Sequence, residues 1–169
     1  PQRTPVLYQA GASASGIDFA ARHAECVFVA APTKPVLKRY VDTLRARATG
    51  HGRAADQLVY NLTTVIVDET DAKAQAKYRS YLDHASYDGA LTFVSGWSGV
   101  DFARYAPTDL VRRIDTNAVK SLLEHFTDGQ QWTVAELAQW AGVGGLGPVV
   151  VGGPETVADE LQAWQEETG

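Results

Sequence analysis

The sequence has no methionine and a single cysteine, Cys26, in its 169 residues. One cysteine excludes an internal disulfide and a cysteine-based metal cluster. No apolar run reaches the roughly 18 residues that a membrane helix requires, and the first residues lack the apolar segment of a secretory signal. We therefore expect a cytoplasmic protein with no membrane partner. Because no initiator methionine is present, we expect either a processed mature domain or a piece of a longer polypeptide.

Basic residues are also in short supply. Fifteen Lys and Arg stand against 20 Asp and Glu, a formal net charge of −5, which argues against a nucleic-acid partner because such proteins carry a basic face. The four histidines have no metal-ligand spacing, so no metal is predicted. A hydrophobic content of 45% and a charged content of 21% are ordinary for one folded domain.

What the sequence does contain is an alternation of strand and helix patterns. Short apolar runs, typical of buried strands, occupy 6–10, 26–30 and 58–67. Each is followed by a stripe with helical spacing, at 17–24, 37–48 and 74–85. Strands that alternate with helices predict parallel strands joined by crossovers, hence an α/β fold.

The second half of the chain has a different pattern. Residues 86–110 are rich in Ser, Gly, Tyr and Trp with poor periodicity, which predicts a long irregular loop. Trp97, Phe102 and Tyr105 in this loop either line a pocket or pack the loop onto the body. We accordingly divide the chain into strand–helix units (1–85), an insertion with a loop and a helix (86–132) and C-terminal helices (133–169).

Three further patterns lie within the last two units. A helical stripe covers 119–126, and Thr133 with Glu136 has the spacing of a capping box at the start of another helix. Residues 142–153 hold six glycines without a phosphate-loop motif, which predicts a flexible connection. That connection leads into a last helix beginning at Pro154.

One turn is a candidate ligand site. Residues 8–16 combine the end of a strand, a run of small residues and the start of a helix. The first N–H groups of a helix have no partner within the helix and favour an anion such as phosphate, and Ser13 and Ser15 add hydroxyl groups. The alternative is an ordinary strand-to-helix turn in which serine caps the helix.

Three segments together resemble the bacterial luciferase-like flavin monooxygenases. They are Gln9–Ser13 followed by Gly16–Phe28, then Trp132–Ala138, then Gly144–Leu161. The resemblance is to the branch that contains nitrilotriacetate monooxygenase component A, dibenzothiophene-sulfone monooxygenase and the long-chain alkane monooxygenases. It covers nearly the whole chain in the same order.

The resemblance implies a fold that the chain supplies only in part. The family fold is a (β/α)8 TIM barrel more than twice this length, and this chain corresponds to its C-terminal part, about strands five to seven. The barrel is therefore incomplete, and its N-terminal half is an expected partner. Residues 86–110 fall where the family carries an insertion near the substrate entrance.

The resemblance also implies a function. It predicts a two-component monooxygenase that receives reduced FMN from a separate NAD(P)H:flavin reductase, forms a flavin hydroperoxide with O₂, oxidises a small organic substrate and assembles as a homo-oligomer. The residues matching the family's phosphate contacts are Gly11, Ala12 and Ser13, reached from Gln9. The family often has serine where this chain has Ala12, which removes one hydroxyl and keeps the backbone N–H. No catalytic acid or base is identified.

Two other functions remain open at this stage. One is a flavin- or deazaflavin-dependent oxidoreductase of the same superfamily that transfers hydride without oxygenation. The other is a non-catalytic fragment that binds no flavin.

Overall fold

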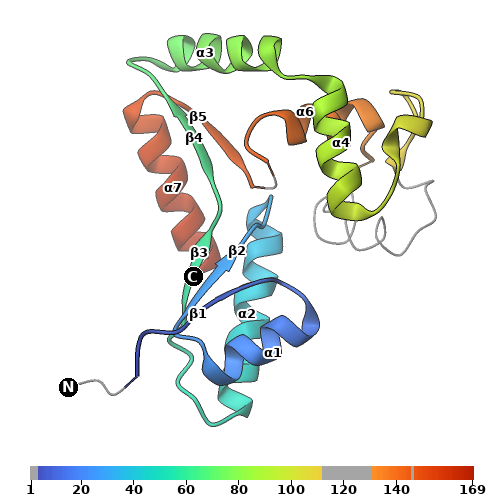
Figure 1. Ribbon diagram of the computed structural model, residues 1–169. Helices are drawn as coiled ribbons and strands as arrows, with labels where there is room; N and C mark the ends of the chain where they lie inside the picture. Colours follow the sequence, from blue (N-terminus) through green and yellow to red (C-terminus); the bar gives the residue numbers. More distant parts are fainter. Residues whose placement is uncertain (1–3, 112–130, 146) are drawn as a thin grey trace.

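The computed structural model describes residues 4–111, 131–145 and 147–169, and it is built on parallel strands (Figure 1). One sheet contains β1 (Tyr8–Ala10), β2 (Cys26–Val29) and β3 (Leu58–Asn61), and a second contains β4 (Thr64–Val67) and β5 (Val149–Gly152). The strands within both sheets pair in parallel. The helices are α1 (Ala14–His23), α2 (Lys34–Gly50), α3 (Asp71–His84), α4 (Tyr87–Ser98), α6 (Val134–Gly142) and α7 (Pro154–Thr168), with a 3₁₀ turn, η1 (Phe102–Arg104). The predicted α/β class is confirmed.

The run 58–67, predicted as one strand, is divided into β3 and β4. β3 pairs with β2, whereas β4 pairs with β5. At the break, the Leu62 N–H donates to the Val29 carbonyl at 2.8 Å and the Thr64 N–H to the Pro148 carbonyl at 2.9 Å. The hydrogen-bonding partner thus changes from one neighbour to the other within two residues.

The expectation of a flexible connection over residues 142–153 is wrong, because this segment contains β5. Its apolar run pairs with β4, and Thr64 Oγ1 donates to the Gly144 carbonyl at 3.4 Å. A Cβ added at Gly147 would lie 2.1 Å from the Leu62 carbonyl oxygen. Here glycine permits a close approach of two backbones, so a high glycine content did not signify flexibility.

The expectation of an irregular loop over residues 86–110 is also wrong, because residues 87–98 form α4. Ser86 caps its start by accepting the Gly89 N–H at 3.0 Å, and Gly99 ends it at φ 72°. Its buried residues, Ala90, Leu91 and Val94, share a hydrophobic core with α6. Glycines and serines lower helix propensity, but packing of an apolar face overrides it.

The aromatic residues of this segment separate into buried and exposed groups. Phe102 is fully buried in the same core and Tyr105 packs against it, whereas Trp97 is 48% exposed. The predicted capping box is confirmed: Glu136 N donates to Thr133 Oγ1 and Thr133 N to Glu136 Oε2. The helix predicted at 119–126 lies outside the described residues, and the division of the chain at 85 and 132 stays a prediction.

Helices cover one face of the larger sheet. Ala20 and Ala21 of α1, Val27 of β2 and Leu44 of α2 form a core with no exposed surface. Arg53 closes the end of α1 by donating to the carbonyls of Ala20, Ala21 and Ala24. α2 also contacts α7, which places α7 beside it (Figure 1).

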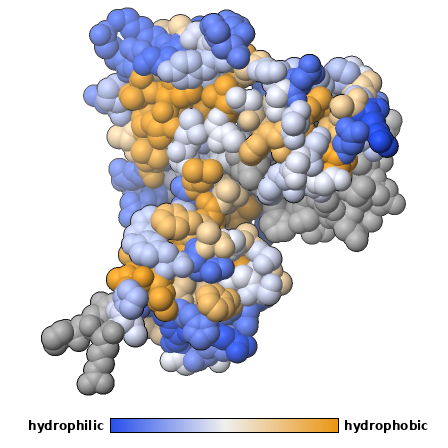
Figure 2. All heavy atoms as spheres, in the orientation of Figure 1, coloured by the Kyte–Doolittle hydropathy of each residue, from blue (hydrophilic) through white to orange (hydrophobic). Residues whose placement is uncertain are grey.

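The opposite sheet face displays apolar side chains (Figure 2). Tyr8, Phe28 and Tyr60 form a row on neighbouring strands, with ring centroids 5.6 and 5.3 Å apart, and are 59%, 48% and 43% exposed. Leu58, Leu62, Val65 and Val67 extend the exposed apolar surface along β3 and β4. In the part of the chain that the structure describes, no helix is long and apolar enough to cross a membrane.

Candidate functional site

The β1–α1 turn brings the four predicted phosphate residues together. Gly11 has φ 128°, a conformation that favours glycine and lets the chain leave β1 sharply. Ser13 caps α1, accepting the Gly16 N–H on Oγ at 3.1 Å. Gln9 is half-buried beside the turn and donates through Nε2 to the Ala10 carbonyl at 3.0 Å.

The capping alternative and the ligand alternative are compatible at Ser13. Its oxygen accepts the Gly16 N–H, and the hydroxyl proton remains able to donate to Ser15 Oγ, 3.4 Å away, or to a ligand. Ser13 and Ser15 are both exposed. The first turn of α1 contains no acidic residue, so its positive end is left available to an anion.

Ala12 is half-buried and packs against the core formed by α1, α2 and β2. Its methyl group therefore points toward the protein interior. Its contribution to an anion site would come from its backbone N–H, as expected from the sequence.

Two side chains of α2 hold the carbonyls of this turn. Tyr40 Oη donates to the Gly11 carbonyl at 3.3 Å, and Arg47 Nη1 donates to the Ala14 carbonyl at 2.7 Å. Burial raises the pKa of Tyr40 to about 12. Sequence reasoning identified neither contact. The partners are separated by 29 and 33 positions in the sequence, and they meet only because α2 packs on α1.

The N-terminus of α7 has a different environment, since a carboxylate of the protein occupies it. Asp71 Oδ1 accepts the Gly153 N–H at 2.6 Å, and this contact lowers the pKa of Asp71, as does a hydrogen bond from Thr156. α7 also carries Glu155 in its first turn. A phosphate at this junction would meet negative charge.

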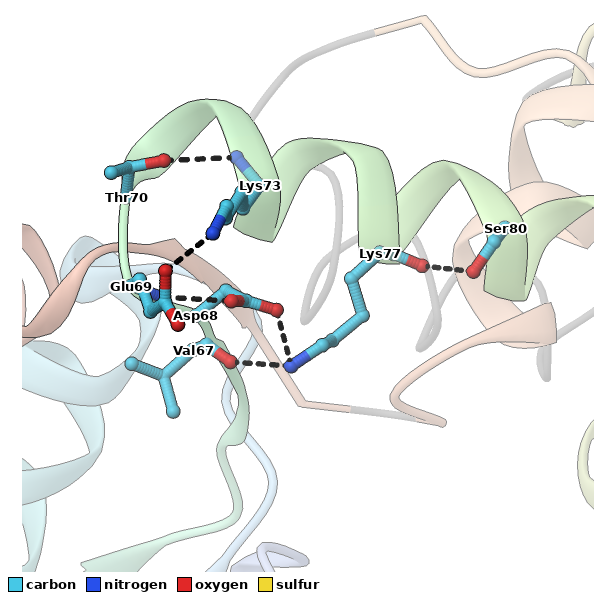
Figure 3. Close-up of polar contacts among 7 residues, drawn as sticks. All are labelled: Val67, Asp68, Glu69, Thr70, Lys73, Lys77 and Ser80. Atoms are coloured by element: carbon cyan, nitrogen blue, oxygen red, sulfur yellow. Dashed lines mark hydrogen bonds and ion pairs between the residues drawn. The ribbon is translucent and has the colours of Figure 1, made fainter.

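The β4–α3 junction is likewise satisfied internally (Figure 3). Lys77 Nζ lies 2.7 Å from Asp68 Oδ2 and donates to the Val67 carbonyl at 2.8 Å. The ammonium of Lys77 lowers the pKa of Asp68, and Lys73 pairs with Glu69 nearby. Sequence reasoning identified neither ion pair.

Asn61, at the end of β3, ties two strand ends together. Its side chain accepts the Ala31 N–H at 2.8 Å and donates to the Ala31 carbonyl at 3.0 Å. The chain after Ala31 leads to the start of α2, where Lys34 pairs with Glu160 and Glu167 of α7. Lys34 thereby links the start of α2 to α7. In parallel α/β folds, sites form at these carboxyl ends of strands.

Among the residues that the structure describes, no cluster of three or more His, Cys, Asp or Glu side chains could hold a metal ion. Cys26 is buried, and His51 pairs with Asp18 at 3.0 Å.

The chain belongs to the luciferase-like monooxygenase family, whose model matches residues 1–169. The resemblance drawn from the sequence is therefore confirmed, including its branch, since long-chain alkane, nitrilotriacetate and dibenzothiophene-sulfone monooxygenases are among the relatives. Dimethyl-sulfide monooxygenase of Hyphomicrobium sulfonivorans is 40% identical over 100% of this chain and 36% of its own length.

Solved structures agree with these relatives. The crystal structure of DmoA from Hyphomicrobium sulfonivorans matches 100% of this chain and 36% of its own with a TM-score of 0.84. Long-chain alkane monooxygenase, known from Geobacillus thermodenitrificans, is 35% identical, with a TM-score of 0.78 over 99% of this chain and 35% of its own. A riboflavin lyase with modified FMN is 32% identical, with a TM-score of 0.78 over 99% and 37%. The chain spans little more than a third of these relatives' length.

Proposed function

We propose that this chain forms the phosphate-binding side of the flavin site in a two-component, reduced-FMN-dependent monooxygenase. The observation that carries the proposal is the β1–α1 turn. It presents an exposed Ser13 hydroxyl beside the capped Gly16 N–H, and its first turn holds no acidic residue, whereas the N-terminus of α7 is closed by Asp71. Membership of the family and the FMN named in one related structure support a flavin phosphate as the anion.

The residues present fit that group. The phosphate of FMN would accept hydrogen bonds from the backbone of Ala12 and Ser13 and from the Ser13 hydroxyl, with the conformation of Gly11 opening the turn. Gln9 would lie beside the phosphate. Reduced FMN, when bound, supplies electrons for the reduction of O₂, and the protein binds and orients it and excludes water.

The names of the relatives indicate the chemical class of the substrate and the kind of partner. The relatives are named for oxidising small organic compounds such as dimethyl sulfide and long-chain alkanes, so we propose a small organic substrate. One relative is named component A of its monooxygenase, which favours a separate NAD(P)H:flavin reductase as the second component.

We further propose that the exposed sheet face is covered by the N-terminal half of a (β/α)8 barrel. Apolar side chains such as Phe28, Leu58 and Leu62 are about half exposed there, which is unusual for a sheet of parallel strands. The 169-residue chain alone is expected to self-associate in size-exclusion chromatography. A monomer with a cooperative melt would contradict this.

The incorporation of labelled oxygen into the product tests the reaction. The protein, isolated with any polypeptide that completes its flavin site, is supplied with reduced FMN and a panel of alkanes and organic sulfides. Substrate-dependent incorporation of labelled oxygen from O₂ into product supports the monooxygenase. Substrate oxidation without oxygen incorporation would instead support hydride transfer, and no flavin binding at all would support a non-catalytic fragment.

A further inference from the structure

Tyr40 is a core residue whose hydroxyl reaches the β1–α1 turn from a neighbouring helix. It is 8% exposed and belongs to the same hydrophobic core as Val41 and Leu44 of α2. Its Oη donates to the Gly11 carbonyl at 3.3 Å. A buried tyrosine hydroxyl usually has a hydrogen-bond partner. Here the partner is the Gly11 carbonyl, so Tyr40 restrains the orientation of that backbone group.

The peptide bond between Gly11 and Ala12 links the orientation of the Gly11 carbonyl to that of the Ala12 N–H. The bond between Gly11 and Ala12 is trans, as the described chain contains no cis peptide. In a trans peptide the C=O and the next N–H point in opposite directions. A Gly11 carbonyl held toward Tyr40 and the core therefore aims the Ala12 N–H away from the core, to the side where a ligand would approach.

Gly11 needs such a restraint because its backbone is unusually free. At φ 128° it occupies a region that glycine samples about as readily as any other. A Cβ at this position would meet only Gln9 Nε2, at 4.0 Å, so packing around Gly11 does little to hold the peptide. The Tyr40 hydroxyl supplies a hydrogen bond where steric contact is weak.

A second contact from α2 secures the other end of the turn. Arg47 Nη1 donates to the Ala14 carbonyl at 2.7 Å. The two contacts come from residues seven apart on α2, hence from one face of that helix. α2 thus holds the carbonyls of residues 11 and 14, between which the expected phosphate contacts lie.

We propose that Tyr40 is a positioning residue for the flavin phosphate: its hydroxyl holds the Gly11 carbonyl inward so that the Ala12 N–H faces the phosphate. This inference rests on the proposed function. Tyr40 does not touch the ligand. Burial keeps its pKa near 12, so the hydroxyl remains a protonated donor across the pH range of any flavin assay.

The test compares FMN with riboflavin, which lacks the phosphate. Flavin binding is titrated by fluorescence with the protein isolated together with any polypeptide that completes its flavin site. The unsubstituted protein should bind FMN more than tenfold more tightly than riboflavin. Tyr40→Phe, which removes one oxygen and no carbon, should weaken FMN about fivefold, the scale of one hydrogen bond, and leave riboflavin unchanged.

Tyr81→Phe is the matched control, because it makes the same chemical change at a 48% exposed residue of α3. It should leave both affinities unchanged. Thermal melts establish that each variant is folded. Should Tyr40→Phe fail to fold, Arg47→Gln tests the second contact from half-buried Arg47 and should lower the FMN-to-riboflavin ratio in the same way.

Each result separates one idea from the other. Equal affinity of the unsubstituted protein for FMN and riboflavin would overturn the phosphate site itself, and the role of Tyr40 with it. A preserved preference for FMN in Tyr40→Phe would overturn the positioning role and leave the proposed function standing. Equal weakening of both flavins would assign Tyr40 to general stability and would also overturn the positioning role.

Discussion

The two halves of this protein use the same structural unit differently. In the first half, the turn from β1 into α1 leaves the helix N-terminus exposed, with carbonyls held from behind by Tyr40 and Arg47. In the second half, the turn from β5 into α7 is closed by Asp71, which accepts the Gly153 N–H. A helix N-terminus attracts an anion in either case. What differs is whether a carboxylate of the protein occupies the helix end: Asp71 does so at α7, and the first turn of α1 holds no acidic residue.

The largest expected effect concerns the close backbone packing between Gly147 and Leu62. Gly147→Ala would place Cβ 2.1 Å from the Leu62 carbonyl oxygen, and the backbone on at least one side must move. We expect a loss of about 3 kcal/mol in the free energy of unfolding, at the upper end of overpacking effects. Urea denaturation of the protein measures it.

Gly96→Ala is the control for that substitution. Gly96 lies within α4 and an added Cβ meets nothing within 4 Å, so alanine should stabilise the helix by about 0.5–1 kcal/mol. If Gly147→Ala proved as harmless as Gly96→Ala, the glycine-rich segment before β5 would be a loose connection after all.

The next prediction compares the helix cap at the β1–α1 turn with the cap at the β4–α3 junction. Ser13→Ala and Thr70→Ala each remove a helix cap, since Ser13 accepts the Gly16 N–H and Thr70 accepts the Lys73 N–H at 3.3 Å. Both should lower the free energy of unfolding by about 1 kcal/mol. Only Ser13→Ala should also weaken FMN, by about 1 kcal/mol or fivefold. Fluorescence titration and urea denaturation give the two quantities.

The cap comparison has two informative failures. Unchanged FMN affinity in Ser13→Ala would remove Ser13 from the phosphate site while leaving its capping role. A loss of FMN affinity in Thr70→Ala as large as that in Ser13→Ala would show that the caps act through stability alone.

The same contrast limits what the sequence could reveal. The turn from a strand into a serine-capped helix at residues 8–16 was predictable because its small residues and its cap are contiguous, whereas its role as a phosphate site stays a prediction. The contact of Asp71 with Gly153 could not be predicted in the same way, because the two residues are 82 positions apart. Local patterns report local hydrogen bonds, and contacts between distant segments depend on packing that no short pattern encodes.

The two elements that sequence reasoning mistook fail for a related reason. α4 contains Gly89 and Gly96, and the segment leading into β5 is rich in glycine, so propensity favoured irregular structure in both. In the fold, α4 is stabilised by packing on α6 and β5 by pairing with β4. Glycine suggested irregular structure, whereas α4 tolerates Gly96 in open space and Gly147 permits a close approach of two backbones.

The carboxylate of Asp71 gives the second half an acid-sensitive contact. The Gly153 N–H, followed by Thr156, lowers the pKa of Asp71 below its ordinary value. A depressed pKa stabilises the fold above the unfolded-state pKa, about 3.9, and that stabilisation is lost as pH falls through the folded-state pKa. Asp71→Asn should therefore be less stable at pH 7, with the difference shrinking below about pH 4.

Urea denaturation of Asp71→Asn at pH 7 and pH 3 measures that difference. Asp159→Asn, at an exposed position of the same helix that Asp71 closes, serves as the control. A deficit in Asp71→Asn of equal size at both pH values would mean that the carboxylate charge is not what closes α7.

The smallest effect compares two lysines of α3. Lys77 binds both Asp68 and the Val67 carbonyl and is 37% exposed, whereas Lys73 pairs with Glu69 at the surface and is 59% exposed. Exposed pairs at this spacing contribute little because solvent screens them and the side chains lose entropy. Lys77→Met should lower the melting temperature and Lys73→Met should leave it unchanged, both measured at low salt. If added salt removes the effect of Lys77→Met entirely, charge alone fixes the β4–α3 junction. If part of the effect persists, the hydrogen bond to the strand's last carbonyl contributes as well, and the junction is held from within as the α7 junction is.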